Sequence, residues 1–299
     1  MPNRSGAYTD LKASGDEKLM GVVADVERAL ARARCRHQAD ATPELRTSTM
    51  THVVWAPPEW LERVHRVLAG LEERHPARTI LLVPEPGGAS RVESKVVVRD
   101  FDVVGGHEVL SEVIELHLYG TAADHPASLV LPLLVSDLPA FCRWRGEPAW
   151  TGEAFDELAG VCDRLVFDSA EWRAPARRYG ALAGVFDRVA VSDLAWRRGL
   201  PWRVALAATW PAVGRIERLA IEGPAADAEL LAGWLRSRLR RPVKLTRRPA
   251  DALVRVAVDG ELVEPPTAPP LHASDLLSAE LDTLARDLVY EAAVRASAT

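Results

Sequence analysis

The strongest concentration of residues that could bind a charged ligand is RSRLRRPVKLTRR at 236–248, which holds seven basic residues and no acidic one. Guanidinium groups bind carboxylates and phosphates through paired hydrogen bonds, so this run could contact another protein or a sugar phosphate. Because the run ends a predicted helix, where cations offset the helix dipole, a solvated face is the competing interpretation. Nucleic-acid binding is disfavoured, since Trp234 is the one aromatic residue nearby. The candidate contacts are Arg236, Arg238, Arg240 and Arg241.

A second pattern, tryptophan next to arginine in the sequence, is typical of protein interfaces. Both side chains combine a large contact area with hydrogen bonding or stacking. The sequence has nine tryptophans, and RWRGEPAW at 143–150 contains such a pair. This segment is either an exposed loop that meets a partner or part of the core, whereas Trp196, Trp202 and Trp210 are favoured as core residues. The candidate partner contacts are Arg143, Trp144 and Arg145, with Arg46, Thr47, Thr49 and His52 at the start of a predicted strand.

The sequence lacks three common motifs of α/β enzymes: GxGxxG, a phosphate loop ending in GK[ST], and GxSxG. Its eight histidines form neither HxH nor HExxH, and its three cysteines form no CxxC pair. We therefore expect no catalytic residue, no metal site and no cofactor. The alternative is a sugar-phosphate-binding enzyme or regulator of the α/β class, in which Arg78, Arg143 or Arg145 clamps the anion at strand ends. That alternative lacks a nucleophile or base with a partner.

Length and composition favour a two-domain protein of the cytoplasm. The 299 residues are 48% apolar and carry a net charge of −5, which allows two cores and gives no general attraction to nucleic acid or membrane. The longest apolar run, at 128–135, is far shorter than the roughly 20 residues that a membrane helix needs. The N-terminus does not resemble a signal peptide, and the cysteines form no disulfide framework, so a reducing compartment is expected.

The hydrophobic pattern predicts an α/β fold whose N-terminal domain has a mixed, partly parallel sheet flanked by helices. Residues 1 to about 15 are expected to be disordered, and a helix begins at Asp16. The next three elements make one β-α-β unit with parallel strands: the strand RTSTMTHVVWA, a helix at 61–71 and the strand TILLV. The further predicted elements are strands at 91–104 and 109–119 joined by a turn at Gly105-Gly106, a helix at 122–135, the strand AFCRW at 140–144, a helix at 153–161 and the strand RLVFD at 164–168.

A smaller α+β C-terminal domain is predicted after the arginine-rich loop WRAPARRYG at 172–180. A helix from about 193 to 210 should break near Gly199, because Pro201 cannot continue it. The other predicted elements are a strand at 215–221, a helix at 225–239, strands at 243–245 and 253–258, and one last helix from Ser274. The predicted domain limits are 1–43 for an N-terminal arm and helix, 44–175 for the α/β domain and 176–299 for the α+β domain.

Several strings, taken in order, resemble one known family: RTSTMTHVVW, HPARTILLV, ELHLYGTAADHPASLVLPLLVSDLPAFCRWRG and RLVFDSAEW. They resemble the glucose-6-phosphate dehydrogenase assembly protein family, OpcA, and SDLAWRRGLPWRVALAATW and AGWLRSRLRRPV resemble its C-terminal domain. The resemblance implies a non-catalytic accessory protein that binds glucose-6-phosphate dehydrogenase and promotes its assembled, active form in the oxidative pentose phosphate pathway. NADPH supply would be affected indirectly. Neither nucleic acid nor membrane is an implied partner.

Overall fold

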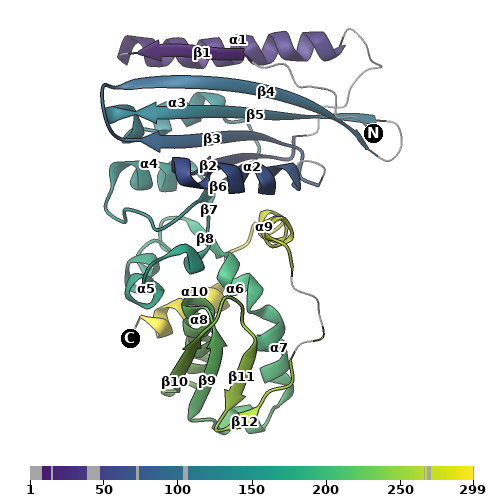
Figure 1. Ribbon diagram of the computed structural model, residues 1–299, viewed down its shortest axis with the longest axis vertical. Helices are drawn as coiled ribbons and strands as arrows, with labels where there is room; N and C mark the ends of the chain where they lie inside the picture. Colours follow the sequence, from purple (N-terminus) through teal and green to yellow (C-terminus); the bar gives the residue numbers. More distant parts are fainter. Residues whose placement is uncertain are drawn as a thin grey trace. The chain divides into compact units, whose positions relative to one another are not determined.

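The computed structural model describes residues 9–14, 16–38, 48–71, 74–103, 107–265, 267 and 271–298. The chain divides into two compact units, Met1–Leu165 and Val166–Thr299. The first has a mixed sheet flanked by helices, and the second has a smaller sheet with its own helices (Figure 1). This confirms the predicted fold class. The limits of the predicted domains remain predictions.

The strands of the first unit's sheet are β1 (Thr9–Ser14), β2 (Met50–Trp55), β3 (Ala77–Glu85), β4 (Arg91–Val103), β5 (His107–Tyr119) and β6 (Ala140–Trp144). They lie in the order β1-β4-β5-β3-β2-β6. β2 pairs in parallel with β3 and β6, and β3 pairs in parallel with β5. β4 is antiparallel to β5 and β1, so the sheet is mixed. β2 and β3 are buried along nearly all their length, which is typical of parallel strands covered on both faces.

The helices of this unit are α1 (Asp16–Gln38), η1 (Pro58–Trp60), α2 (Leu61–Ala69), η2 (Gly120–Ala123), α3 (Ala127–Val130), η3 (Leu131–Leu133) and α4 (Glu153–Val161). α1 packs on β4 and also contacts α3. Its Val26 and Leu30 are four residues apart, so they share one helix face, and both are fully buried. The predicted helices at Asp16 and at 153–161 are confirmed.

Two predictions for the first unit are wrong. The sequence predicts disorder for the arm, but β1 lies there. It pairs with the edge of β4 that β5 does not occupy, because an unpaired strand edge readily adds another strand. The helix predicted at 122–135 is instead three short turns, because Pro126 and Pro132 lack the N–H that a continuous helix requires. The turn predicted at Gly105-Gly106 lies outside the described residues.

The boundary between the units falls inside β7 (Arg164–Phe167), which precedes β8 (Ala190–Asp193). The smaller sheet of the second unit contains β9 (Arg218–Gly223), β10 (Lys244–Pro249), β11 (Arg255–Val258) and β12 (Glu261–Leu262). Its order is β10-β9-β11-β12, with β10 parallel to β9, and β11 antiparallel to β9 and β12. The helices are η4 (Ser169–Glu171), α5 (Pro175–Ala183), α6 (Leu194–Arg198), α7 (Leu200–Ala208), η5 (Ala212–Arg215), α8 (Ala225–Leu239), α9 (Ala273–Leu281) and α10 (Leu288–Ser297).

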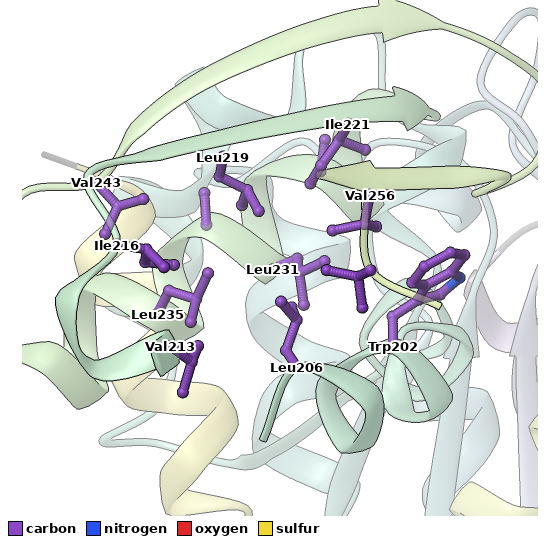
Figure 2. Close-up of a cluster of buried hydrophobic side chains, with 13 residues drawn as sticks. Trp202, Leu206, Val213, Ile216, Leu219, Ile221, Leu231, Leu235, Val243 and Val256 are labelled. Atoms are coloured by element: carbon purple, nitrogen blue, oxygen red, sulfur yellow. The ribbon is translucent and has the colours of Figure 1, made fainter. Parts of the chain in front are cut away.

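The core of the second unit lies between its sheet and the helices α7 and α8. Figure 2 shows Leu219 and Val256 pointing from the sheet toward Leu231 of α8 and Leu206 of α7. Each is almost completely buried. Burying a leucine or valine side chain stabilises a fold by roughly 1.5–3 kcal/mol, so this cluster fixes α8 against the sheet.

Local sequence signals explain where the helices of the second unit begin and end. The break predicted near Gly199 is confirmed, since α6 ends and α7 begins there. The predicted loop at 172–180 is wrong, because Pro175 is compatible with the first turn of a helix and begins α5. The prediction of one last helix is also wrong. α9 and α10 are separate, and Asp287 caps α10 by accepting from Val289 N at 3.0 Å.

Candidate functional site

The end of helix α8 and the start of β10 form a basic pocket of about 570 Å³. Pro242, Val243 and Ala296 line part of it, and no carboxylate is among the lining residues. Three of the four arginines predicted in this run contribute to the lining, whereas the exposed Arg238 does not. The basic side chains of the pocket are Arg236, Arg240, Arg241 and Lys244.

Backbone carbonyls hold two of these guanidinium groups in place. Arg236 Nε donates to Val243 O at 3.1 Å. Arg241 Nη2 donates to Ile216 O at 2.6 Å and to Gly214 O at 3.2 Å, while its Nε is buried with no acceptor among the described residues. Carbonyl oxygens bring only partial negative charge, so both arginines stay largely uncompensated.

A second surface feature of this unit is the outer side of α7. Trp202 and Leu206, four residues apart, face the core and are buried. Leu200 and Val204 are also four residues apart, but they lie on the other side of the helix with 40% and 61% of their surface exposed. Exposed large apolar side chains gathered on one surface are typical of interaction sites.

Trp210, two residues beyond the end of α7, is a further exposed apolar side chain. The sequence favours a core position for Trp210, but 70% of its surface is exposed, so that expectation is wrong. The reason is that α7 ends at Ala208, before the helical pattern would return Trp210 to the core. Its ring packs against Gly214 instead. We call the exposed Leu200 and Val204, together with Trp210 just beyond the helix, the apolar face of α7.

A buried charge network lies within the same unit. Arg198 Nε donates to Asp227 Oδ1 at 3.0 Å, and its Nη2 donates to Asp168 Oδ1 at 3.1 Å. Burial lowers the pKa of Arg198, but the two carboxylates outweigh burial and raise this pKa above its ordinary value. The arrangement neutralises two carboxylates that burial would otherwise penalise. Removing Arg198 would therefore leave this burial penalty uncompensated.

Asp193 belongs to the same buried region, and the pKa of its carboxyl group is raised. Its Oδ1 accepts from Ser169 N at 3.0 Å and from Ala195 N at 2.9 Å, and its Oδ2 accepts from Tyr290 OH at 3.3 Å. Burial, followed by the charge of Asp168, raises the pKa of Asp193 from 3.8 to about 6. Because the folded state binds this proton more tightly than the unfolded chain, the free energy of unfolding falls as the pH rises from about 4 to about 6.

We expect Asp193→Asn to remove this part of the pH dependence. In the parent chain, this titration lowers the free energy of unfolding by at most about 3 kcal/mol between pH 4 and pH 7, because each unit of pKa corresponds to 1.36 kcal/mol. Asparagine keeps the oxygen that accepts from both backbone amides, so the fold is retained. Denaturant unfolding over a pH series measures the effect, with the exposed Asp187→Asn as the control. An unchanged slope in Asp193→Asn would contradict the assignment.

The predicted contacts at the start of β2 have different surroundings. Arg46 and Thr47 lie outside the described residues. Thr49 is exposed, and its N–H donates to Pro76 O at 3.0 Å. His52 is buried inside β2, where burial, and then the charge of Arg143, lowers its pKa to about 3. His52 is thus neutral and away from solvent at neutral pH.

Arg143, Trp144 and Arg145 are buried, with exposed fractions of 2%, 4% and 6%. Trp144 stacks on Trp55 with ring centroids 4.8 Å apart, and the guanidinium of Arg145 lies 4.3 Å from the ring centroid of Trp60. The exposed-loop interpretation is therefore wrong for these three residues, because the pairing of β6 with β2 draws them into the first unit. Burial leaves little of their surface for a partner to contact.

Arg78 is not available as an anion clamp. Its Nε donates to Glu112 Oε2 at 2.9 Å, and its Nη1 donates to Leu133 O at 2.9 Å. Its charge is thus compensated within the fold. With Arg143 and Arg145 also buried, the clamp predicted for a sugar-phosphate-binding protein does not form in the described part of the first unit.

The described residues contain neither a metal-binding cluster nor a helix that could span a membrane. Within these ranges, no group of three or more histidine, cysteine, aspartate or glutamate side chains could hold a metal ion. None of the helices in the same ranges combines the length and apolar character needed to cross a membrane.

Sequence reasoning did not identify the apolar face of α7, although a signal was present. Two apolar rows at four-residue spacing, Leu200 with Val204 and Trp202 with Leu206, occur in one short helix. The two rows lie on different sides of the helix. If the core covers one side, the row on the other side must be exposed or contact a partner. Which row is buried does not follow from the spacing.

Comparison with known proteins gives three matches. A family model for the N-terminal domain of a glucose-6-phosphate dehydrogenase subunit, of the OpcA type, matches residues 69–183. The corresponding C-terminal domain model matches residues 189–264. The OxPP cycle protein OpcA of Nostoc punctiforme is 28% identical over 199 residues, which cover 62% of this chain and 43% of that protein. The matched region is thus less than half of the relative's length.

Proposed function

The chain belongs to the OpcA family of glucose-6-phosphate dehydrogenase assembly proteins, and from this premise we propose that it binds glucose-6-phosphate dehydrogenase and activates it without catalysing a reaction itself. Its place of action would be the cytoplasm. By promoting the assembled, active dehydrogenase, it would act on NADPH supply in the oxidative pentose phosphate pathway. The family match supports the pathway and the identity of the partner.

The observation that carries a binding function is the apolar face of α7. Val204 and Trp210 expose 61% and 70% of their surface, although the same helix has a second apolar row in the core. Leaving large apolar groups in water costs stability that a protein recovers when a partner covers them. Tryptophan is also among the residues that contribute most to binding at interfaces. We therefore assign the dehydrogenase contact to this face.

Activation requires that the protein bind one state of the dehydrogenase better than another. A difference of about 1–3 kcal/mol between the active and inactive states shifts their ratio roughly 5- to 150-fold. An interface of about 800 Å² on each partner would suffice for specific binding. The apolar face would form the centre of such an interface, with polar groups around it.

The other predicted contacts differ in how accessible they are to a partner. Thr49 and Arg238 are exposed and remain proposed contacts with the dehydrogenase. Arg46 and Thr47 remain proposals from the sequence. His52 and the residues Arg143, Trp144 and Arg145 are buried, so they offer a partner little surface to contact.

Mixing the purified chain with the dehydrogenase tests the proposal. We expect a complex on size-exclusion chromatography and altered steady-state kinetics of NADPH formation. Val204→Asp places a charge on the outer side of α7, and Trp210→Ala removes the largest exposed apolar side chain near it in sequence. Each should weaken binding by about 30-fold or more, because central interface residues contribute about 2 kcal/mol or more.

Leu131→Asp is the matched control, because Leu131 is 55% exposed but belongs to the first unit. Equal loss of binding in the control would refute the assignment to α7. No complex and unchanged kinetics with the parent chain would refute the proposed function itself. Steady turnover of a sugar phosphate by the isolated chain would favour the enzyme alternative.

A further inference from the structure

The basic pocket at the end of α8 carries more positive charge than its surroundings neutralise. None of its four cationic side chains forms an ion pair with a carboxylate among the described residues. The C-terminal end of α8 supplies only about half a negative charge through the helix dipole, which offsets a small part of four positive charges. Glu229 interacts with Arg236 at longer range but does not line the pocket. An excess of this size in a concave site attracts an anion.

The geometry of the pocket favours an oxyanion with several oxygens. Arg236 uses Nε, and Arg241 uses Nη2, to bind backbone carbonyls. These bonds hold the guanidinium planes and leave further N–H groups for a ligand, apart from the buried Nε of Arg241. Arginine binds phosphate through two parallel hydrogen bonds, and a fixed guanidinium loses less entropy when it does so. Lys244 adds a compact positive charge on a flexible side chain, which adjusts to the position of the ligand.

Arg240 occupies a backbone position where glycine is the usual residue. Its φ of 53° lies in the left-handed region, which disfavours any side chain. The side chain is nonetheless exposed and lines the pocket. Helix termination alone would favour glycine here, so an arginine indicates a use for its guanidinium.

We propose that this pocket binds a small phosphorylated metabolite, a phosphate monoester with an organic group of about sugar size. A volume of about 570 Å³ is within the range of small-molecule sites and is much larger than a phosphate ion needs. Pro242 and Ala296, which line the pocket and are at least partly exposed, would contact the organic part. The ligand would make the accessory protein responsive to a metabolite. This inference does not rest on dehydrogenase binding, because the pocket is complete within one unit of the chain.

Calorimetric titration of the full chain, without dehydrogenase, tests the pocket. The probes are glucose 6-phosphate, a pentose phosphate, a nucleoside monophosphate, orthophosphate and glucose. We expect at least one ester to bind at submillimolar concentration, orthophosphate to bind at least tenfold more weakly than that ester, and glucose not to bind. Raising the salt concentration should weaken binding, since the attraction is electrostatic.

Arg240→Gly is the decisive variant, because it removes a pocket cation while placing the preferred residue in the left-handed position. We expect affinity for the ester to fall at least tenfold, as is typical when a charged hydrogen bond is lost, while the melting temperature does not fall. Lys244→Ala should also weaken binding. Arg238→Ala, on the same helix but outside the lining, should bind like the parent.

Three outcomes would overturn the proposal. One is that no phosphorylated probe binds at millimolar concentration. Another is that orthophosphate binds as tightly as every ester, because the organic group would then have no site. The third is that Arg240→Gly and Arg238→Ala change affinity equally. If the chain binds an acidic peptide of the dehydrogenase here and no ester, a protein contact replaces the metabolite.

Discussion

Replacing Gly233 with alanine is expected to lower the free energy of unfolding of the second unit by about 3 kcal/mol, because overpacking a tight helix contact costs about 1–3 kcal/mol or more. A Cβ at Gly233 of α8 would overlap Ser297 Oγ and the carbonyl oxygen of Ala293, both on α10. Part of that contact is backbone, so a side-chain rotation cannot relieve it. The two helices would have to separate, and Ala296, which lines the basic pocket, would move with α10.

Thermal and denaturant unfolding measure this effect, and Gly180→Ala is the matched control. Gly180 lies in helix α5 of the same unit and is exposed, and a Cβ there would meet nothing within 4 Å. Since alanine is the better helix former, the control should gain about 0.5–1 kcal/mol. If both variants shift stability in the same direction, the close approach of α8 and α10 is not the cause. Gly233→Ala should also weaken ester binding in the basic pocket.

The second large effect is expected for Arg198→Met, which removes the cation between Asp168 and Asp227. The Asp227 side chain is fully buried and the Asp168 side chain is 12% exposed, so the variant removes the Arg198 cation from two carboxylates that are largely shielded from water. Breaking a buried ion pair in this way costs about 3–5 kcal/mol, and the 31% exposure of the Arg198 side chain favours the lower end. We therefore expect the free energy of unfolding to fall by about 3 kcal/mol at pH 7.

A double variant separates the loss of the arginine from the penalty on the carboxylates. Asp227→Asn in the Arg198→Met background removes one uncompensated charge, so it should recover part of the lost stability. The neighbouring Arg197→Met is the control, since Arg197 is 37% exposed in its side chain and 3.9 Å from Glu280. Such a partly exposed pair contributes at most about 1 kcal/mol. No recovery in the double variant would show that lost packing, and not charge, causes the effect.

Some elements were predictable because their signals are local. The helix predicted at 225–239 has those same limits as α8, and the break near Gly199 follows from Pro201. The parallel pairing of β2 and β3 was expected because a helix connects two short buried strands. The helix predicted at 122–135 was wrong, although Pro126 and Pro132 were visible in the sequence. The apolar run favours a helix, but each proline lacks the N–H that a continuous helix needs, so the run forms short turns.

The candidate sites were predictable only in part. The basic run identified Arg236, Arg240 and Arg241, because charges close together in sequence stay close at the end of one helix. Burial was not predictable in the same way. Arg143 and Arg240 look alike as arginines in mixed apolar and basic segments, yet the first is buried in β6 and the second is exposed. Their difference depends on which distant elements cover each segment.

The sequence by itself determined the family, the α/β class, the order of most elements and the basic character of the end of α8. Tertiary structure decided which tryptophans are buried, leaving Trp202 at 6% and Trp210 at 70% exposure, and which arginines keep uncompensated charge. Helix and strand signals depend on neighbours within a few residues, so the sequence contains them directly. Burial and charge compensation depend on contacts between residues far apart in the chain, which form only when the whole unit packs.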